Sequence, residues 1–142
     1  MTTDYKKIIA QTIDDLKEAV GHLQYSYKKV GSLSNKKEQL DEEELETWEG
    51  FVSRFARVSD LFLNKYLRAK VLLADPAFRG EFIDILNKAE KMSLIESADV
   101  WYEIRALRNF SVHEYAREKF SNTIHRMVEL TPLLLNTKNA SN

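Results

Sequence analysis

Apolar side chains recur every three or four residues along most of this 142-residue chain, and this period constrains the fold more than any other feature. Side chains at that spacing share one face of an α-helix. β-branched residues form no alternating run, and only four glycines and two prolines interrupt the pattern, which leaves little room for turns between strands. The sequence therefore predicts an all-α protein, an antiparallel four-helix bundle with an additional short helix.

Start and stop signals bound the predicted helices. Tyr5 to Val30 carries one apolar stripe, and Gly31 is placed to cap it before a small, polar and basic loop. An acidic cluster from Asp41 suits the positive end of a helix dipole, so a second helix is expected to begin there. The later helices are expected at about Asp41 to Ala74, Phe78 to Ala89, Ala98 to Asn109 and Arg117 to Leu135, with Asp75-Pro76 as a stop and Pro132 as a bend.

Length and composition predict one domain over residues 1–142, large enough to bury a core without cross-links. The polar tail from Asn136 to Asn142 is expected to fray. The absence of cysteine excludes disulfides, thiolate metal sites and cysteine nucleophiles. Because the N-terminus lacks a signal-peptide pattern and no apolar run reaches membrane-spanning length, we expect a soluble, cytoplasmic protein without a membrane partner.

The residues with the clearest chemical potential form one octapeptide, Arg108-Asn109-Phe110-Ser111-Val112-His113-Glu114-Tyr115. It places a guanidinium, an amide, an imidazole and a phenol where one predicted helix gives way to the next. In a continuous helix Arg108 and His113 would lie well apart around the axis. A shared site therefore requires a kink or a short loop between them, and Ser111 offers a side chain to cap the new helix.

With such a break, these residues suit cleavage of RNA without a metal or another cofactor. The planar fork of Arg108 can hold a phosphate, while His113 can move protons near neutral pH. A base deprotonates the 2′-hydroxyl, the oxygen attacks the adjacent phosphorus, and an acid protonates the leaving 5′-oxygen. One chain offers one suitable histidine for two proton transfers, so we expect a two-fold homodimer that joins two octapeptides in one cleft.

A structural interpretation of the octapeptide is also open. Arginine, asparagine and histidine side chains near a helix end can cap carbonyl groups, or can pair with Glu103 or Glu114. His125 and Glu129 are spaced for one helix face, but no further ligands accompany them, so no metal site is expected.

Any contact with RNA must be local, because the formal net charge of the chain is −1. Lys65, Arg68 and Lys70, near the end of the second predicted helix, form the best basic cluster for an RNA path. The same residues can equally be ordinary surface charge.

The pattern Arg-Asn-x-x-x-His-x-Tyr at 108–115 resembles the signature of the HEPN superfamily, in particular the HepT-like toxins and the related nucleotidyltransferase substrate-binding proteins. The resemblance extends from about Trp48 to Leu135, in the order of helices, in Ala77-Phe78-Arg79, and in Trp101 followed by Arg105 and Arg108. Both branches are helical bundles, so the resemblance implies a HEPN-like fold.

For function, the resemblance implies the toxin of a toxin–antitoxin pair. The HepT-like homodimer is a metal-independent endoribonuclease, and a partner minimal nucleotidyltransferase, the antitoxin, silences it by attaching AMP to the motif tyrosine. Carried over, Arg108 and His113 form the catalytic pair, Asn109 is a supporting polar group and Tyr115 is the site of AMPylation. The nucleotide would add negative charge and bulk at the cleft, and would repel an RNA phosphate.

A second interpretation is a non-catalytic substrate-binding or partner subunit of a two-component nucleotidyltransferase. Trp101 with the spacing of Arg105 and Arg108 resembles that branch, whereas Val112-His113-Glu114-Tyr115 resembles the toxin branch. The chain has no glycine-rich phosphate loop and no paired aspartates at nucleotidyltransferase spacing. We therefore expect it to be the partner or the target of such an enzyme.

Overall fold

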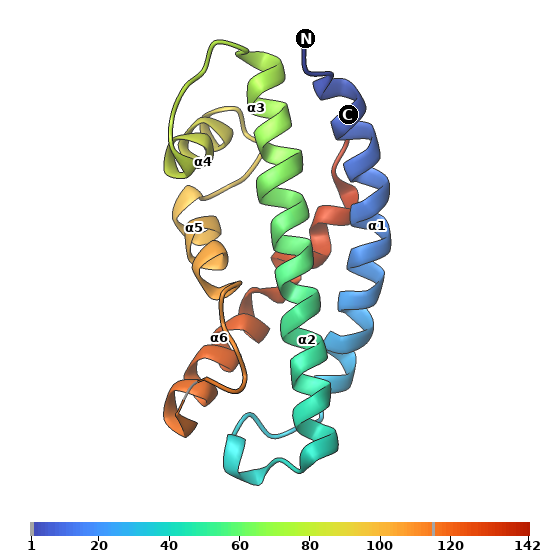
Figure 1. The fold of residues 1–142 in the computed structure, drawn as a ribbon, viewed down its shortest axis with the longest axis vertical. Coiled ribbons are helices and arrows are strands. Elements are labelled where there is room, and N and C mark those ends of the chain that lie inside the picture. The colour runs from blue at the N-terminus through green and yellow to red at the C-terminus, as the bar shows by residue number, and fades with distance from the viewer. Residues whose placement is uncertain (1, 115) are drawn as a thin grey trace.

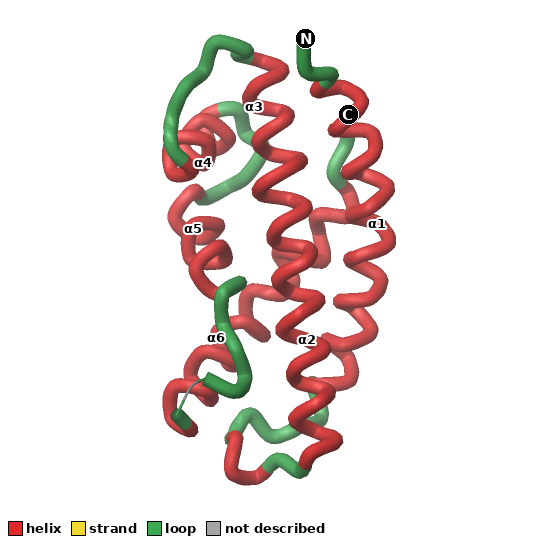
Figure 2. The backbone as a smooth tube through the Cα atoms, in the orientation of Figure 1, coloured by secondary structure: helices red, strands yellow, loops and turns green. Residues whose placement is uncertain are grey.

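The computed structural model describes residues 2–114 and 116–142, and every regular element in these ranges is helical. The main helices run alternately down and up along one long axis, as Figures 1 and 2 show. They are α1 (Tyr5–Val30), α2 (Glu42–Asp60), α5 (Ala98–Leu107) and α6 (Arg117–Leu135), with α4 (Phe82–Lys91) beside α5 as the additional helix. The predicted all-α bundle is confirmed.

Local capping accounts for the starts of the first helices. The Asp4 carboxylate accepts the backbone N–H of Lys7 at 3.0 Å, which begins α1. Asp41 and Glu44 form a capping box at α2, where each side chain accepts the other residue's backbone N–H. The bounds expected for α1 and α6, and the stop at Asp75, are confirmed.

The start of α4 differs from the expectation by one turn. The helix begins at Phe82 instead of Phe78, with Glu81 as the N-cap residue. The carboxylate of Asp84 accepts the backbone N–H of Glu81 at 2.8 Å, which stabilises a start at this point. In the preceding turn the Arg79 guanidinium donates to backbone carbonyls, so this segment is held outside the helix.

α2 is the first part of one longer continuous rod. α2 passes into a wide π-helical turn, η2 (Leu61–Leu67), and then into α3 (Arg68–Ala74). The expected helix from Asp41 to Ala74 is thus confirmed as one rod, while its π turn was not foreseen. Such turns occur frequently at functional sites because they disturb the regular spacing of side chains.

Aromatic rings fill the centre of the bundle. The ring of Trp48 meets those of Phe51 and Phe120 edge-on, at centroid distances of 5.7 and 6.4 Å. Phe62 of η2 lies 4.6 Å from Trp101 of α5. All five side chains are buried, so these aromatic rings form part of the core. Among the described helices, none is both long enough and apolar enough to cross a bilayer.

The loop after α1 is held by the helices beside it. Gly31 ends α1 as expected, and the loop then includes the short 3-10 turn η1 (Lys37–Gln39). The indole N–H of Trp48 donates to the Ser34 carbonyl at 3.1 Å, and the Ser121 hydroxyl donates to the Asn35 carbonyl at 2.6 Å. The loop is therefore attached to both α2 and α6.

The C-terminal tail was expected to fray, and the structure contradicts this. A 3-10 turn, η3 (Asn136–Asn139), packs against α1 and buries Thr137. The Tyr66 hydroxyl donates to the Ser141 carbonyl at 2.7 Å. Burial raises the pKa of the Tyr66 phenol. These contacts come from elements distant in sequence, which the polar composition of the tail does not reveal.

Candidate functional site at the α5–α6 connection

The octapeptide begins where α5 ends. The last residue of α5 is Leu107, two positions before the expected end, and α6 does not begin until Arg117. The break expected between Arg108 and His113 is therefore confirmed. Tyr115, the expected site of AMPylation, lies outside the residues that the structure describes.

Two buried side chains position the connection. Phe110 is 6% exposed and its ring lies 6.0 Å from that of Phe120, while Val112 is 3% exposed. Asn109 and His113, on either side of this pair, face solvent. Burial of alternate residues thus anchors the backbone and leaves the polar side chains outside.

The expected cap at Ser111 is wrong. The N-cap residue of α6 is Ala116, which has no side chain capable of capping. The Ser111 carbonyl instead accepts the backbone N–H of Glu114 at 3.3 Å, within the turn. The new helix starts several residues later than a cap at Ser111 would require, because the turn has to bury Val112 first.

Arg108 is bound by a carboxylate of α2. Its Nε donates to Oδ1 of Asp60 at 2.9 Å, and its Nη2 donates to Oδ2 of the same group. Its Nη1 donates to Oδ1 of Asn109 at 3.0 Å. The hydrogen bonds to Asp60 raise the pKa of Arg108 further above its usual range. The alternative pairing of Arg108 with Glu103 or Glu114 is therefore wrong.

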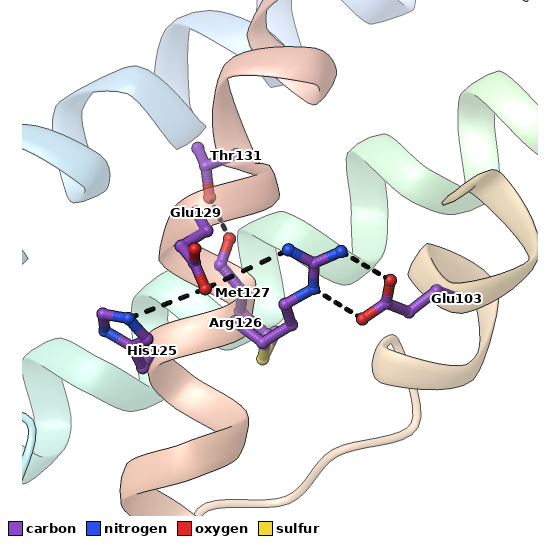
Figure 3. A network of polar contacts seen from close by, with 6 residues as sticks. All are labelled: Glu103, His125, Arg126, Met127, Glu129 and Thr131. Atoms are coloured by element: carbon purple, nitrogen blue, oxygen red, sulfur yellow. Dashed lines mark hydrogen bonds and ion pairs between the residues drawn. The ribbon is translucent and has the colours of Figure 1, made fainter. Parts of the chain in front are cut away.

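Glu103 pairs instead with Arg126 and ties α5 to α6 across the connection, as Figure 3 shows. Nε and Nη2 of Arg126 donate to the two carboxylate oxygens at 2.6 and 2.8 Å. These hydrogen bonds lower the pKa of Glu103 and raise that of Arg126. This bidentate pair limits how far the two helix ends can separate.

His125 and Glu129 lie in the same network. The His125 imidazole is 3.6 Å from the Glu129 carboxylate, which also lies 4.0 Å from Arg126. Within the described ranges, no group of three or more histidine, aspartate or glutamate side chains is arranged to hold a metal ion. The pair is thus part of the surface charge network of α6.

His113 contacts a different carboxylate of α2. Its Nε2 lies 2.9 Å from Oε1 of Glu49, and its side chain is 72% exposed. A carboxylate at this distance restricts the orientation of the ring. The imidazole is accessible to a substrate and has an acidic group behind it.

The two α2 carboxylates define the geometry of the site. Glu49 and Asp60 are eleven positions apart (49 to 60), which is about three helical turns, so they share one face of α2 about 16 Å apart. Among the described residues, no contact joins Arg108 to His113. One chain therefore presents these two groups along a common face, each with its own acidic partner.

The expected basic cluster is divided by the structure. Lys65 lines a surface cavity of about 430 Å³ together with Arg57, Asp60 and Arg108. The Lys70 ammonium instead lies 5.9 Å from the centre of the Tyr66 ring. Of the three residues, Lys65 is the one that lines a cavity together with Arg108 of the octapeptide, as far as the described residues show.

Sequence reasoning missed Glu49 and Asp60. Both lie within an amphipathic helix among many other acidic residues, and only their common helix face could have indicated them. The contacts of Arg108 with Asp60 and of His113 with Glu49 therefore define the candidate site. No family model matches the chain, and neither a curated protein nor a solved structure matches it.

Proposed function

We propose that this protein is a metal-independent endoribonuclease of the HEPN type, active as a homodimer. The observation that carries the proposal is the accessible His113 imidazole with the Glu49 carboxylate 2.9 Å away, on the α2 face to which Arg108 is also bound. A histidine with an acidic partner is a recurring acid–base arrangement, in which the carboxylate orients the ring and stabilises the imidazolium.

The chemistry assigned to these residues is transesterification at an RNA phosphate. One imidazole removes the 2′-hydroxyl proton, the 2′-oxygen attacks phosphorus, and a protonated imidazole donates its proton to the departing 5′-oxygen. Arg108 compensates the negative charge that builds up on the phosphoryl oxygens, and Asn109 steadies the guanidinium by accepting from its Nη1. The glutamate beside each histidine orients the ring for these proton transfers.

The homodimer follows from the number of groups that the reaction needs. Each chain supplies one imidazole with an acidic partner on this face of α2, and Arg108 is bound three turns away from it. A two-fold axis beside His113 would bring the imidazoles of both protomers into one cleft. Both proton transfers could then take place in one cleft.

The proposal includes control by a partner nucleotidyltransferase, the antitoxin, that attaches AMP to Tyr115. Tyr115 follows His113 by two positions, so a nucleotide there would place negative charge beside the imidazole. RNA phosphates would be repelled and the cleft would be obstructed.

One observation favours the second candidate, a non-catalytic partner subunit of the nucleotidyltransferase. All three guanidinium nitrogens of Arg108 already donate, two to Asp60 and one to Asn109. An arginine bound in this way can serve to hold the end of α5 against α2 without contacting a phosphate.

The test is an RNA cleavage assay with purified, unmodified protein in the presence of EDTA. His113→Ala should lower the rate by about 100-fold or more, and Glu49→Gln should lower it by about 10-fold. The matched control is His125→Ala, since His125 is also exposed and also lies beside a glutamate. Equal loss in both histidine variants, or no cleavage by the wild type, would refute the ribonuclease.

The regulatory part is tested by intact mass after co-expression with the candidate nucleotidyltransferase. Wild-type protein should gain one or more AMP units, and Tyr115→Phe should gain none. An unmodified chain that copurifies with the transferase and does not cut RNA would support the partner subunit instead.

A further inference from the structure

α5 lies beside the rod of α2 and α3 (Figure 1). Two surface cavities lie near its C-terminal end, one lined mainly by the rod and Arg108, the other by residues of α4 and α5. The first, of about 430 Å³, is lined by Arg57, Asp60, Lys65 and Arg108 among others. The second, of about 340 Å³, contains Phe82, Tyr102, Arg105 and Asn109. Arg105 connects them, because its Nη1 donates to Asn64, a residue of the first cavity, at 3.3 Å.

The first cavity is locally basic. Asp60 is its one acidic lining residue, and Arg108 already neutralises it. Arg57 and Lys65 form no ion pair within the described part of the chain, so two positive charges remain on this face. A chain with a net charge of −1 thus concentrates positive charge beside the octapeptide.

The second cavity presents an aromatic surface. Tyr102 is 53% exposed, and its ring lies 6.5 Å from that of Phe82 at an angle of 33°. The Arg105 guanidinium lies 4.8 Å from the centre of the Phe82 ring and supports it from one side. Tyr102 and Arg105 lie at helical spacing on one face of α5, and Asn109, just beyond the helix end, lines the same cavity.

We propose that these two cavities form a continuous track for single-stranded RNA, with an unpaired base stacked on Tyr102 and the phosphates bound by Arg57, Lys65 and Arg105. The inference rests on the proposed ribonuclease, whose substrate class it specifies. A positive groove beside exposed aromatic rings is the arrangement by which proteins hold single strands. A duplex buries its bases in the helical stack, so it cannot offer one to Tyr102.

The track also leads the bound strand from Tyr102 towards the octapeptide. Arg108, the C-cap residue of α5, follows Tyr102 by six positions, about 9 Å along the helix axis. A strand whose base rests on Tyr102 passes Arg105 and reaches the cavity that Arg108 lines. The stacked base therefore sets which phosphate arrives at the octapeptide.

The experiment measures binding of a fluorescein-labelled 12-nucleotide oligoadenylate to His113→Ala protein by fluorescence anisotropy. Tyr102→Ala should weaken binding on the order of ten-fold, while Tyr102→Trp should retain it. The matched control is Tyr25→Ala, because Tyr25 is 64% exposed and also lies near an arginine, but belongs to α1. Tyr25→Ala should leave the affinity unchanged.

Two further measurements address the phosphates and the base. Removal of Arg57 or Lys65 should reduce the slope of log K against log salt by about 0.7 each. The exposed Lys17 of α1 provides the control, Lys17→Ala, which should leave the slope unaltered. An abasic strand of the same length should bind the Tyr102-containing protein about ten-fold more weakly, and this comparison needs no variant at Tyr102.

Equal affinity for abasic and intact strands, or equal effects of Tyr102→Ala and Tyr25→Ala, would overturn the track. So would a Tyr102→Ala variant that binds RNA normally but changes its mass in light scattering, which would assign the patch to a protein interface. Failure of the ribonuclease is distinguishable from these results. If wild-type protein leaves RNA uncut while binding still depends on Tyr102, the track stands and the catalytic proposal falls.

Discussion

The replacement of Asp60 by alanine is expected to loosen the attachment of the α5–α6 connection to α2. Arg108 loses two charge-assisted hydrogen bonds, and the two side chains are about one-third exposed, at 32% and 35%. Exposed pairs contribute about 0.2–1 kcal/mol, and hydrogen bonds to charged groups about 1.5–3 kcal/mol. Because water screens this pair in part, we expect a coupling free energy of about 1–1.5 kcal/mol, or roughly 3–5 °C in Tm.

A double-mutant cycle isolates this coupling from other effects of each substitution. The free energy of unfolding is measured by urea denaturation, followed by circular dichroism, for wild type, Asp60→Ala, Arg108→Ala and the double variant. The control cycle uses Lys88 and Asp75, an exposed pair joined by one contact at 3.6 Å, for which we expect less than about 0.5 kcal/mol. A coupling no larger than that of the control would refute the reasoning, since the bidentate geometry would then contribute nothing measurable.

Three other predictions concern the bundle around the site. Arg126 lowers the pKa of Glu103, so the stability that the ionised Glu103 contributes is present above about pH 5 and is lost as the pH falls. Glu103→Gln should therefore reduce the fall of Tm at acidic pH, and an unchanged fall would contradict this. Burial raises the pKa of Tyr66, so the stability from its neutral phenol is present below about pH 10 and is lost above it. Tyr66→Phe should remove this alkaline loss, cost about 1 kcal/mol and speed amide exchange near Ser141, whereas unaltered exchange would show that the hydroxyl does not hold the tail. Phe120→Ala should cost about 3–5 kcal/mol in urea unfolding, and a loss below about 1 kcal/mol would contradict its place in the core.

The position of the octapeptide could be predicted, but its contacts could not. A change in helical pattern marked the break between Arg108 and His113, and the structure confirms it. The partner of Arg108 is 48 positions away at Asp60, and that of His113 is 64 positions away (49 to 113) at Glu49. Nearby acidic residues such as Glu103 were the natural candidates from sequence, yet Glu103 faces α6 and pairs there.

The errors at element ends have the same origin. Polar composition predicted a frayed tail, but Tyr66 and α1, which are distant from it in sequence, contact the tail in the structure. Ser111 was a reasonable cap by residue type, but the connection first has to bury Phe110 and Val112 against the core. In both places, tertiary packing outweighed a local preference of about 1 kcal/mol.

The sequence by itself determined the helices and the bundle, because apolar period, capping residues and proline stops act over a few neighbouring positions. The bounds of α1 and α6 therefore followed from the chain alone. The tertiary structure decided which carboxylate each site residue meets and that Tyr102 lies beside a basic face. These outcomes depend on how α2 and α5 are rotated against each other. The rotation of each helix about its axis depends on packing of the whole core, so the sequence of one segment does not predict it.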